Sequence, residues 1–157
     1  CQDNETGWLD WSLLPRNAEI YNFFKQCIAL HKRYSLFRQE DFFHGHGRTS
    51  DSETFISWQF LHPEEENWGD DCLGLAFHLY EDEEGAGDGF FIMLNGYRDR
   101  TLSFVLPQCP PGSSWRKIIN TAAAPPEDIC SLDSAPRAAG SDDVAPMSCK
   151  VLQRASG

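Results

Sequence analysis

The part of the sequence after Ser35 is a series of short apolar runs separated by polar segments rich in glycine, aspartate and glutamate. Between positions 73 and 79 the apolar residues leucine and phenylalanine recur at every second position, as side chains on one face of a strand do. The runs cover residues 55–60, 72–80, 90–94, 102–106, 115–121 and 147–153. Six or more short strands joined by turn-forming segments are typical of an antiparallel β-sandwich, so a mainly β fold is predicted.

One helix is predicted before the strands, from Ala18 to about Tyr34. Asn17 stands where a side chain can cap its first turn, and Glu19 suits the positive end of the helix dipole. Its apolar residues recur at helical spacing: Ile20, Phe23, Phe24, Cys27, Ile28 and Leu30. The pattern indicates an amphipathic helix whose aromatic stripe packs against the rest of the fold.

Two segments between the apolar runs are predicted as loops. The acidic stretch EDEEGAGDG at 81–89 joins two strand candidates and is interpreted as a solvated hairpin loop. It lacks the alternating ligand positions and closing glutamate of a calcium loop, so calcium binding is disfavoured. Residues 122–143 contain three prolines and several alanines, which favours a loop or partly disordered segment.

Charge and hydropathy exclude several partners. The chain has 157 residues and a formal net charge of −11, and none of its Lys and Arg residues form a dense basic cluster. Nucleic-acid binding requires a basic face, so no nucleic-acid partner is predicted. No apolar run approaches the length of a membrane span, and no secretory signal pattern is present, so no membrane partner is predicted either.

The cysteines and histidines do not predict a metal site. Six cysteines are spread along the chain without a CxxC pair, which favours free, partly buried thiols. His44 and His46 would face one side of an extended segment, but no further zinc ligands are evident nearby. Loop polarity is the preferred interpretation of this pair, and no metal or cofactor is predicted.

The opening stretch CQDNETGWLDW contains the carboxylates Asp3, Glu5 and Asp10 close to aromatic rings. A glycoside hydrolase needs two carboxyl groups facing each other across a bond, whereas these three lie in one short segment without an evident partner across a cleft. Sequence motifs for a nucleophile elbow, a phosphate loop or an HExxH zinc site are absent as well. The segment alone is therefore not predicted to be catalytic.

Trp8 and Trp11 leave two interpretations open. Flat indole faces beside Asp3, Asn4 and Glu5 could line a carbohydrate cleft. The other interpretation, which spacing alone favours, makes both tryptophans buried residues that pack on the adjacent helix.

The opening CQDNETGWLDWSLL resembles the segment after the eighth barrel strand of isoamylase-type debranching enzymes, which are α-amylase-like hydrolases. NAEIYNFFKQCIALHKRY and SLFRQEDFFHG resemble the last barrel helix and its exit. The rest matches the family's carboxyl-terminal β-sandwich in order, through FISWQF, NWGDDCLGLAFHL, GFFIMLNGYRDRTLSFVLP, SWRKIINTA and APMSCKVL. Asn120 departs from the family, which usually has Asp before Thr. The resemblance implies that residues 1–36 end a (β/α)8 barrel and that residues 37–157 form the sandwich.

The resemblance also implies a function. Family members cut α-1,6 branch points of glycogen and starch with carboxylates at the ends of earlier barrel strands, so this segment alone is expected to be inactive. Asp3, Asn4, Glu5 and Trp8 would lie on an active-face loop and line the substrate. The implied partners are a branched α-glucan, bound through the parent enzyme, and the upstream barrel; a homo-oligomer is left open. The expected compartment is the cytoplasm, or the plastid stroma of a starch-making cell.

Two other classes of function remain open. A non-catalytic structural or assembly β-sandwich is compatible with every pattern above and is the stronger rival. A stand-alone carbohydrate-binding module would explain the strands and aromatic residues, although not the barrel-like opening.

Overall fold

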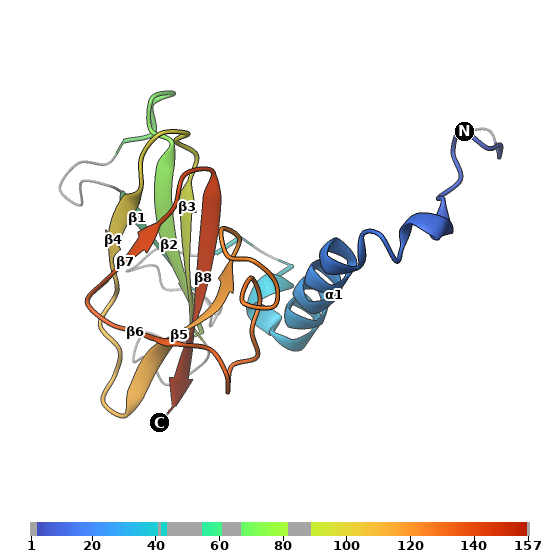
Figure 1. The fold of residues 1–157 in the computed structure, drawn as a ribbon. Coiled ribbons are helices and arrows are strands. Elements are labelled where there is room, and N and C mark those ends of the chain that lie inside the picture. The colour runs from blue at the N-terminus through green and yellow to red at the C-terminus, as the bar shows by residue number, and fades with distance from the viewer. Residues whose placement is uncertain (1–2, 41, 44–54, 61–66, 82–88, 157) are drawn as a thin grey trace.

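A computed structural model describes residues 3–40, 42–43, 55–60, 67–81 and 89–156 (Figure 1). The helical elements are the 3-10 turns η1 (Trp11–Leu13) and η2 (Ser35–Phe37) and the helix α1 (Ala18–Arg33). The strands are β1 (Phe55–Phe60), β2 (Gly74–Tyr80), β3 (Gly89–Asn95), β4 (Leu102–Val105), β5 (Ser113–Asn120), β6 (Arg137–Ala138), β7 (Ser141–Val144) and β8 (Ser148–Ser156).

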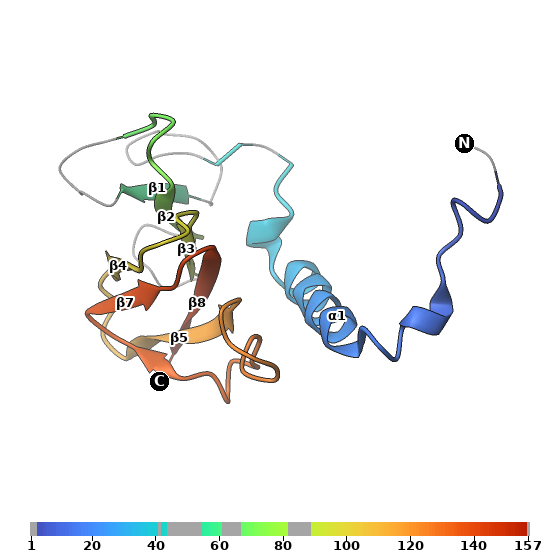
Figure 2. The same ribbon diagram turned by 45° about the horizontal axis from the view of Figure 1, so that its top comes forward.

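The strands form two antiparallel sheets. Six of them pair in the order β1-β2-β3-β8-β5-β6, and β4 pairs with β7 in a small second sheet. Figure 2 shows the large sheet between α1 on one side and the small sheet on the other. The prediction of a mainly β, antiparallel sandwich preceded by a helix is confirmed.

The large sheet separates two hydrophobic cores because side chains along a strand alternate between its faces. On β3, Phe90 and Ile92 join the first core, which lies on the α1 side and includes Tyr34 and Leu36 from the end of the helix. Phe91 and Met93, the alternate β3 residues, join the second core. That core faces the small sheet and contains residues such as Phe104, Val144 and Leu152.

A β-bulge changes the alternation in β5. The register with β8 shifts between Lys117 and Ile119, which inserts one extra residue into β5. Trp115 therefore packs in the second core, whereas both Ile118 and Ile119 pack in the first. The bulge directs two consecutive isoleucines toward α1.

The prediction of a loop at 122–143 was wrong in part, because β6 and most of β7 lie there. Along β7, Asp142 and Val144 are buried, whereas Ser141 and Asp143 are exposed. The Asp142 carboxylate pairs with Lys150 Nζ at 2.7 Å and with Lys117 Nζ at 3.2 Å, both from the large sheet. A strand whose inward residues include an aspartate does not show apolar alternation, so sequence patterning misses it.

Helix α1 begins at Ala18 as predicted, but the predicted side-chain cap was wrong. Asn17 occupies the N-cap position, yet its Nδ2 donates to the Leu13 carbonyl at 3.1 Å, and no capping bond is formed to the first turn. The preceding turn thus competes for the Asn17 side chain.

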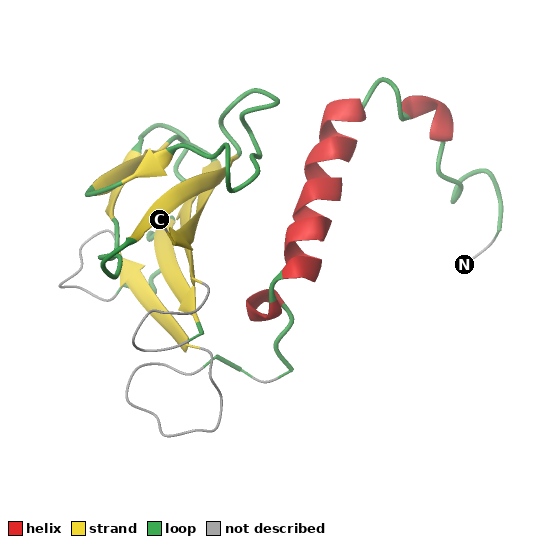
Figure 3. Ribbon diagram, turned by 90° about the horizontal axis from the view of Figure 1, so that it is seen from below, coloured by secondary structure: helices red, strands yellow, loops and turns green. Residues whose placement is uncertain are grey.

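Only part of the apolar surface of α1 is covered. Phe23, Cys27 and Leu30 pack against the first core. Ile20, Phe24 and Ile28, spaced four residues apart, are each more than half exposed and form what is called here the outer stripe. In Figure 3, α1 lies alongside the sheet. Ile20 and Phe24 border an open pocket whose other wall is the segment at 121–128. The expected packing of the aromatic stripe is therefore confirmed for one side of the helix only.

Several sequence predictions lie wholly or partly outside the described residues. His44 and His46 are outside them, and so is most of the acidic segment, at 82–88. β2 and β3, which flank that segment, do pair antiparallel. The five cysteines that are described are all free and half-buried, as predicted. Within the described part of the chain, no helix is both long and apolar enough to span a membrane.

Candidate functional site

The opening stretch folds on itself through local hydrogen bonds. Trp8 Nε1 donates to Asp3 Oδ1, which joins two of the predicted substrate-lining residues. Asn4 holds a turn, since its Oδ1 accepts from Thr6 N at 3.1 Å and its carbonyl accepts from Gly7 N at 2.9 Å. The segment therefore presents an indole ring and a carboxylate as one unit.

Asp10 sets the conformation that follows. Its Oδ1 accepts from Ser12 N at 2.9 Å and from Ser12 Oγ at 2.6 Å, so it caps η1. The Ser12 hydroxyl, and then its backbone N–H, lower the pKa of the Asp10 carboxyl because both bonds favour the charged form. The role that the structure gives Asp10 is that of the η1 cap.

The opening stretch is open to solvent. Trp8 is 61 % and Trp11 70 % exposed, and Asp3, Asn4 and Glu5 are exposed as well. Both tryptophans are therefore largely uncovered rather than buried against α1, which corrects that interpretation for this chain. In Figure 1 the stretch lies on the far side of α1 from the sheets. Exposed rings and hydrogen-bonding groups suit contact with a sugar, and a role for the four residues in substrate binding stays a prediction.

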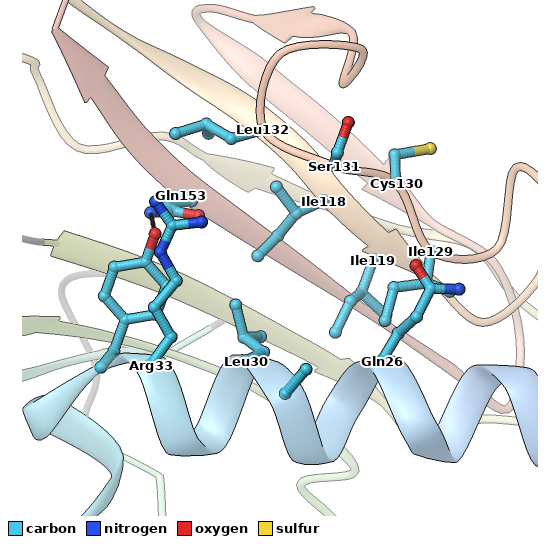
Figure 4. Close-up of a pocket in the computed structure, with 12 residues that line it drawn as sticks. Gln26, Leu30, Arg33, Ile118, Ile119, Ile129, Cys130, Ser131, Leu132 and Gln153 are labelled. Carbon is cyan, nitrogen blue, oxygen red and sulfur yellow. Dashed lines mark hydrogen bonds between the residues drawn. The ribbon is translucent and has the colours of Figure 1, made fainter.

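A cavity of about 210 Å³ lies between α1 and the large sheet (Figure 4). Leu30 of α1 faces Ile118 and neighbouring apolar residues of the sandwich. At its polar end, the buried Gln153 donates from Nε2 to Tyr34 Oη. The Arg33 guanidinium lies 5.3 Å from the centre of the Tyr34 ring. The cavity shows that α1 is seated on the sheet without close packing along its whole length.

Two cysteines have perturbed thiols. Burial raises the pKa of Cys27, and the nearby Cys149 and Asp128 raise it further. Burial likewise raises the pKa of Cys109, although a hydrogen bond with Ser113 acts in the opposite direction. In both thiols burial is the largest influence and favours the protonated form. Among the residues that the structure describes, no group of three or more His, Cys, Asp or Glu is arranged to hold a metal ion.

An aromatic cluster at the β1 edge of the large sheet was missed by the sequence reasoning. Trp58 and Trp68 are 46 % and 59 % exposed, and their ring centres lie 5.3 Å apart at an interplanar angle of 77°. Phe60 lies 4.9 Å from the Trp68 ring, and Phe77 lies 5.3 Å from the Trp58 ring. Residues two apart on a strand share a face, so a strand at 55–60 places Trp58 and Phe60 on the same side. That pattern does not show how much of Trp58 the fold leaves exposed.

Comparison with known proteins finds similarity to one part of a longer protein. No protein-family model matches it. It is 30 % identical over 135 residues to proteins described as glycogen operon protein GlgX homologs, from Mycobacterium bovis and Mycobacterium tuberculosis. The similarity covers 77 % of this chain but 19 % of each relative. The chain thus spans about a fifth of the length of these relatives, and the similarity relates it to a part of them.

Proposed function

We propose that the chain is the carboxyl-terminal part of a debranching hydrolase that acts on α-1,6 branch points of glycogen or starch. The observation that carries the proposal is the similarity to glycogen operon proteins over 77 % of the chain. A helix followed by an antiparallel sandwich is the order of elements that the resemblance implies. The cytoplasm, or a plastid stroma in a starch-making cell, is the proposed compartment.

In this proposal residues 1–36 complete a barrel and residues 37–157 form the accessory sandwich. The outer stripe of α1 supports this division, because helices around a (β/α)8 barrel contact the barrel as well as their neighbours. The inner side of α1 already packs on the sandwich through Phe23 and Leu30. The outer stripe would then face the upstream barrel.

The 157-residue chain alone is expected to be inactive, since the catalytic carboxylates of such an enzyme stand on earlier barrel strands. The test compares this chain with the product of the complete gene on amylopectin and glycogen, by release of reducing ends. Activity in the complete product alone supports the proposal. Turnover by the chain alone that is lost on changing Asp3 or Glu5 would overturn it.

Within the parent enzyme, Asp3, Asn4, Glu5 and Trp8 are proposed to shape a sugar subsite. Trp8→Ala or Asn4→Ala should lower the rate on a branched glucan tenfold to a hundredfold, the equivalent of about 1 to 3 kcal/mol. The matched control is Trp11→Ala, an equally exposed tryptophan outside the proposed subsite. If Trp8→Ala or Asn4→Ala instead lowers the melting temperature and leaves the kinetics per folded molecule unchanged, the stretch supports the fold and does not bind the substrate.

The outer stripe also favours a second candidate, a non-catalytic module that assembles with another subunit. This candidate predicts no activity in the complete gene product and no retention of the chain on immobilised glycogen. A stand-alone carbohydrate-binding module predicts retention without activity. Sequencing upstream of residue 1 and the activity assay together separate the three functions.

A further inference from the structure

The Trp58 and Trp68 cluster lies away from the opening stretch and from the inner side of α1. β1 is the outermost strand of the large sheet, whereas the cavity beneath α1 is lined by residues of β5 and β8. Trp58 is paired in register with Phe77 of β2, and Trp68 belongs to the segment that leads into β2. Because Phe77 packs against the first core, the cluster lies on the α1 face of the large sheet, at its β1 edge and apart from the residues that line the cavity.

Three hydrogen bonds hold the segment that carries Trp68. Gly69 N donates to Asn67 Oδ1 at 2.8 Å, and Cys72 N donates to the Gly69 carbonyl at 3.0 Å, which closes a tight turn. Tyr97 Oη donates to the Asp71 carbonyl at 2.9 Å and anchors the turn to the segment after β3. A ring on a braced backbone segment loses less conformational entropy when a ligand stacks on it than a ring on a loose segment does.

The turn that carries Trp68 also carries acceptor oxygens. A side-chain Cβ at Gly69 would lie 2.8 Å from Asp71 Oδ1 and 3.0 Å from Asn67 Oδ1, so these two oxygens converge on the glycine. A side chain at residue 69 would displace one or both of these oxygens. The carboxylate of Asp70 is exposed beside them. The surface thus combines two apolar ring systems with a set of hydrogen-bond acceptors.

We propose that Trp58, Trp68 and the Asn67–Asp71 turn form an accessory binding surface for a linear, neutral α-glucan chain; this inference rests on the proposed function. A sugar ring offers an apolar C–H face for stacking and hydroxyl groups that donate to carboxylates. A polyanionic ligand is disfavoured by the net charge of −11. A protein partner is less suited, because the cores of protein interfaces are depleted in aspartate.

The test is affinity electrophoresis of the 157-residue chain in gels containing soluble linear α-1,4-glucan, with maltoheptaose as competitor. Retardation should weaken at least fivefold in Trp58→Ala and in Trp68→Ala, and Trp68→Tyr, which keeps an aromatic face, should retain most of it. Phe24→Ala is the matched control, since Phe24 is an exposed aromatic residue on α1 and lies outside the surface. Circular dichroism melts establish that each variant is folded.

Equal retardation of folded Trp58→Ala, Trp68→Ala and wild-type chains would overturn the inference, as would no retardation of the wild-type chain. Gly69→Ala, which alters the turn without removing a tryptophan, should also weaken retardation. If a tryptophan variant instead abolishes self-association without changing retardation, the surface is a protein interface and the inference fails. The proposed function is tested separately, because debranching by the complete gene product does not depend on this surface binding linear glucan.

Discussion

Strand β3 and helix α1 are both rich in apolar residues, but their burial is opposite. Six of the seven β3 residues are buried, whereas α1 contains no buried residue. The strand lies inside a sheet that is covered on one face by α1 and η2 and on the other by β4 and β7. The helix has a covering layer on one side only. Apolar content predicts that a surface needs a partner, and the topology decides whether this chain supplies one.

The largest expected difference between β3 and α1 is the loss of unfolding free energy when a phenylalanine is replaced by alanine. Phe90→Ala should lower the free energy of unfolding by about 3 to 5 kcal/mol, because it leaves a cavity where Tyr34 and Phe37 contact the ring. Phe24→Ala, in the outer stripe, should lower it by less than about 1 kcal/mol. Urea denaturation of the two variants measures both values. Equal losses would show that the outer stripe is as well packed as the sheet.

The second prediction tests the polar support of the sandwich. Asn95 is buried, and its Nδ2 donates to the carbonyls of Arg100, Val144 and Ala145 at 2.9 to 3.0 Å, which ties β3 to β7. Asn95→Ala leaves these acceptors without that donor and should lower the free energy of unfolding by about 1 to 3 kcal/mol. The matched control is Asn22→Ala on the exposed surface of α1, which should have almost no effect. A similar loss in both would refute the role of the Asn95 network.

The two regions also differ in how far sequence reasoning could reach. The strands at 55–60 and 90–94 and the helix at 18–34 were predictable because their apolar spacing follows from local geometry. β7 was not, because the burial of Asp142 depends on two lysines of the large sheet. The side-chain conformation of Asn17 was missed because the turn at Leu13 competes for it.

The two candidate sites, the opening stretch and the Trp58 and Trp68 cluster, also differ in how far the sequence could predict them. Asp3 and Trp8 lie five positions apart, so their proximity was within reach of the sequence, and the segment was singled out on that basis. The pairing of Trp58 with Trp68 depends on a turn anchored by Tyr97, which is distant in sequence. Whether a tryptophan is exposed depends on the packing of elements that are distant in sequence, so a local sequence pattern does not predict it.

The third prediction concerns the attachment of α1. Leu30 packs against the first core, and Leu30→Ala should weaken that attachment by about 1 to 2 kcal/mol, so that local opening of the helix rises roughly tenfold. Cys27 should then be alkylated about tenfold faster, while Cys109, on the other side of the sheet, should be unaffected. Peptide mass spectrometry after a timed reaction with iodoacetamide measures both rates. Parallel acceleration at Cys109 would mean that the whole sandwich had loosened.

The same attachment should depend on pH. Burial raises the pKa of Cys27 above its ordinary value of 9.0, so the attached helix favours the protonated thiol. This stabilisation of the attached helix is fully present at pH values below the pKa that Cys27 has in the unfolded chain. It is lost as the pH rises through the higher pKa that Cys27 has in the folded chain. Detachment should increase above about pH 9 in the wild-type chain and less in Cys27→Ser, and hydrogen exchange of α1 amides would reveal the difference.

The smallest expected effect on folding belongs to the outer stripe itself. Replacing Ile20, Phe24 and Ile28 together with glutamine should leave the free energy of unfolding of this chain within about 0.5 kcal/mol per site, because exposed side chains have little packing to lose. The wild-type chain should associate or aggregate as its concentration rises, since a contiguous exposed apolar face promotes association. The variant should remain monomeric in light scattering at the same concentrations.

This variant separates the two accounts of α1. If the outer stripe serves an upstream barrel, the same three substitutions should destabilise the complete gene product strongly while leaving the isolated chain folded. If the stripe joins two copies of this chain, monomerisation should occur in both. A wild-type chain that is a compact monomer with Phe24 protected from solvent would contradict both, because α1 would then have rotated its outer stripe onto the sandwich. The contrast between a covered strand and a half-covered helix would in that case disappear.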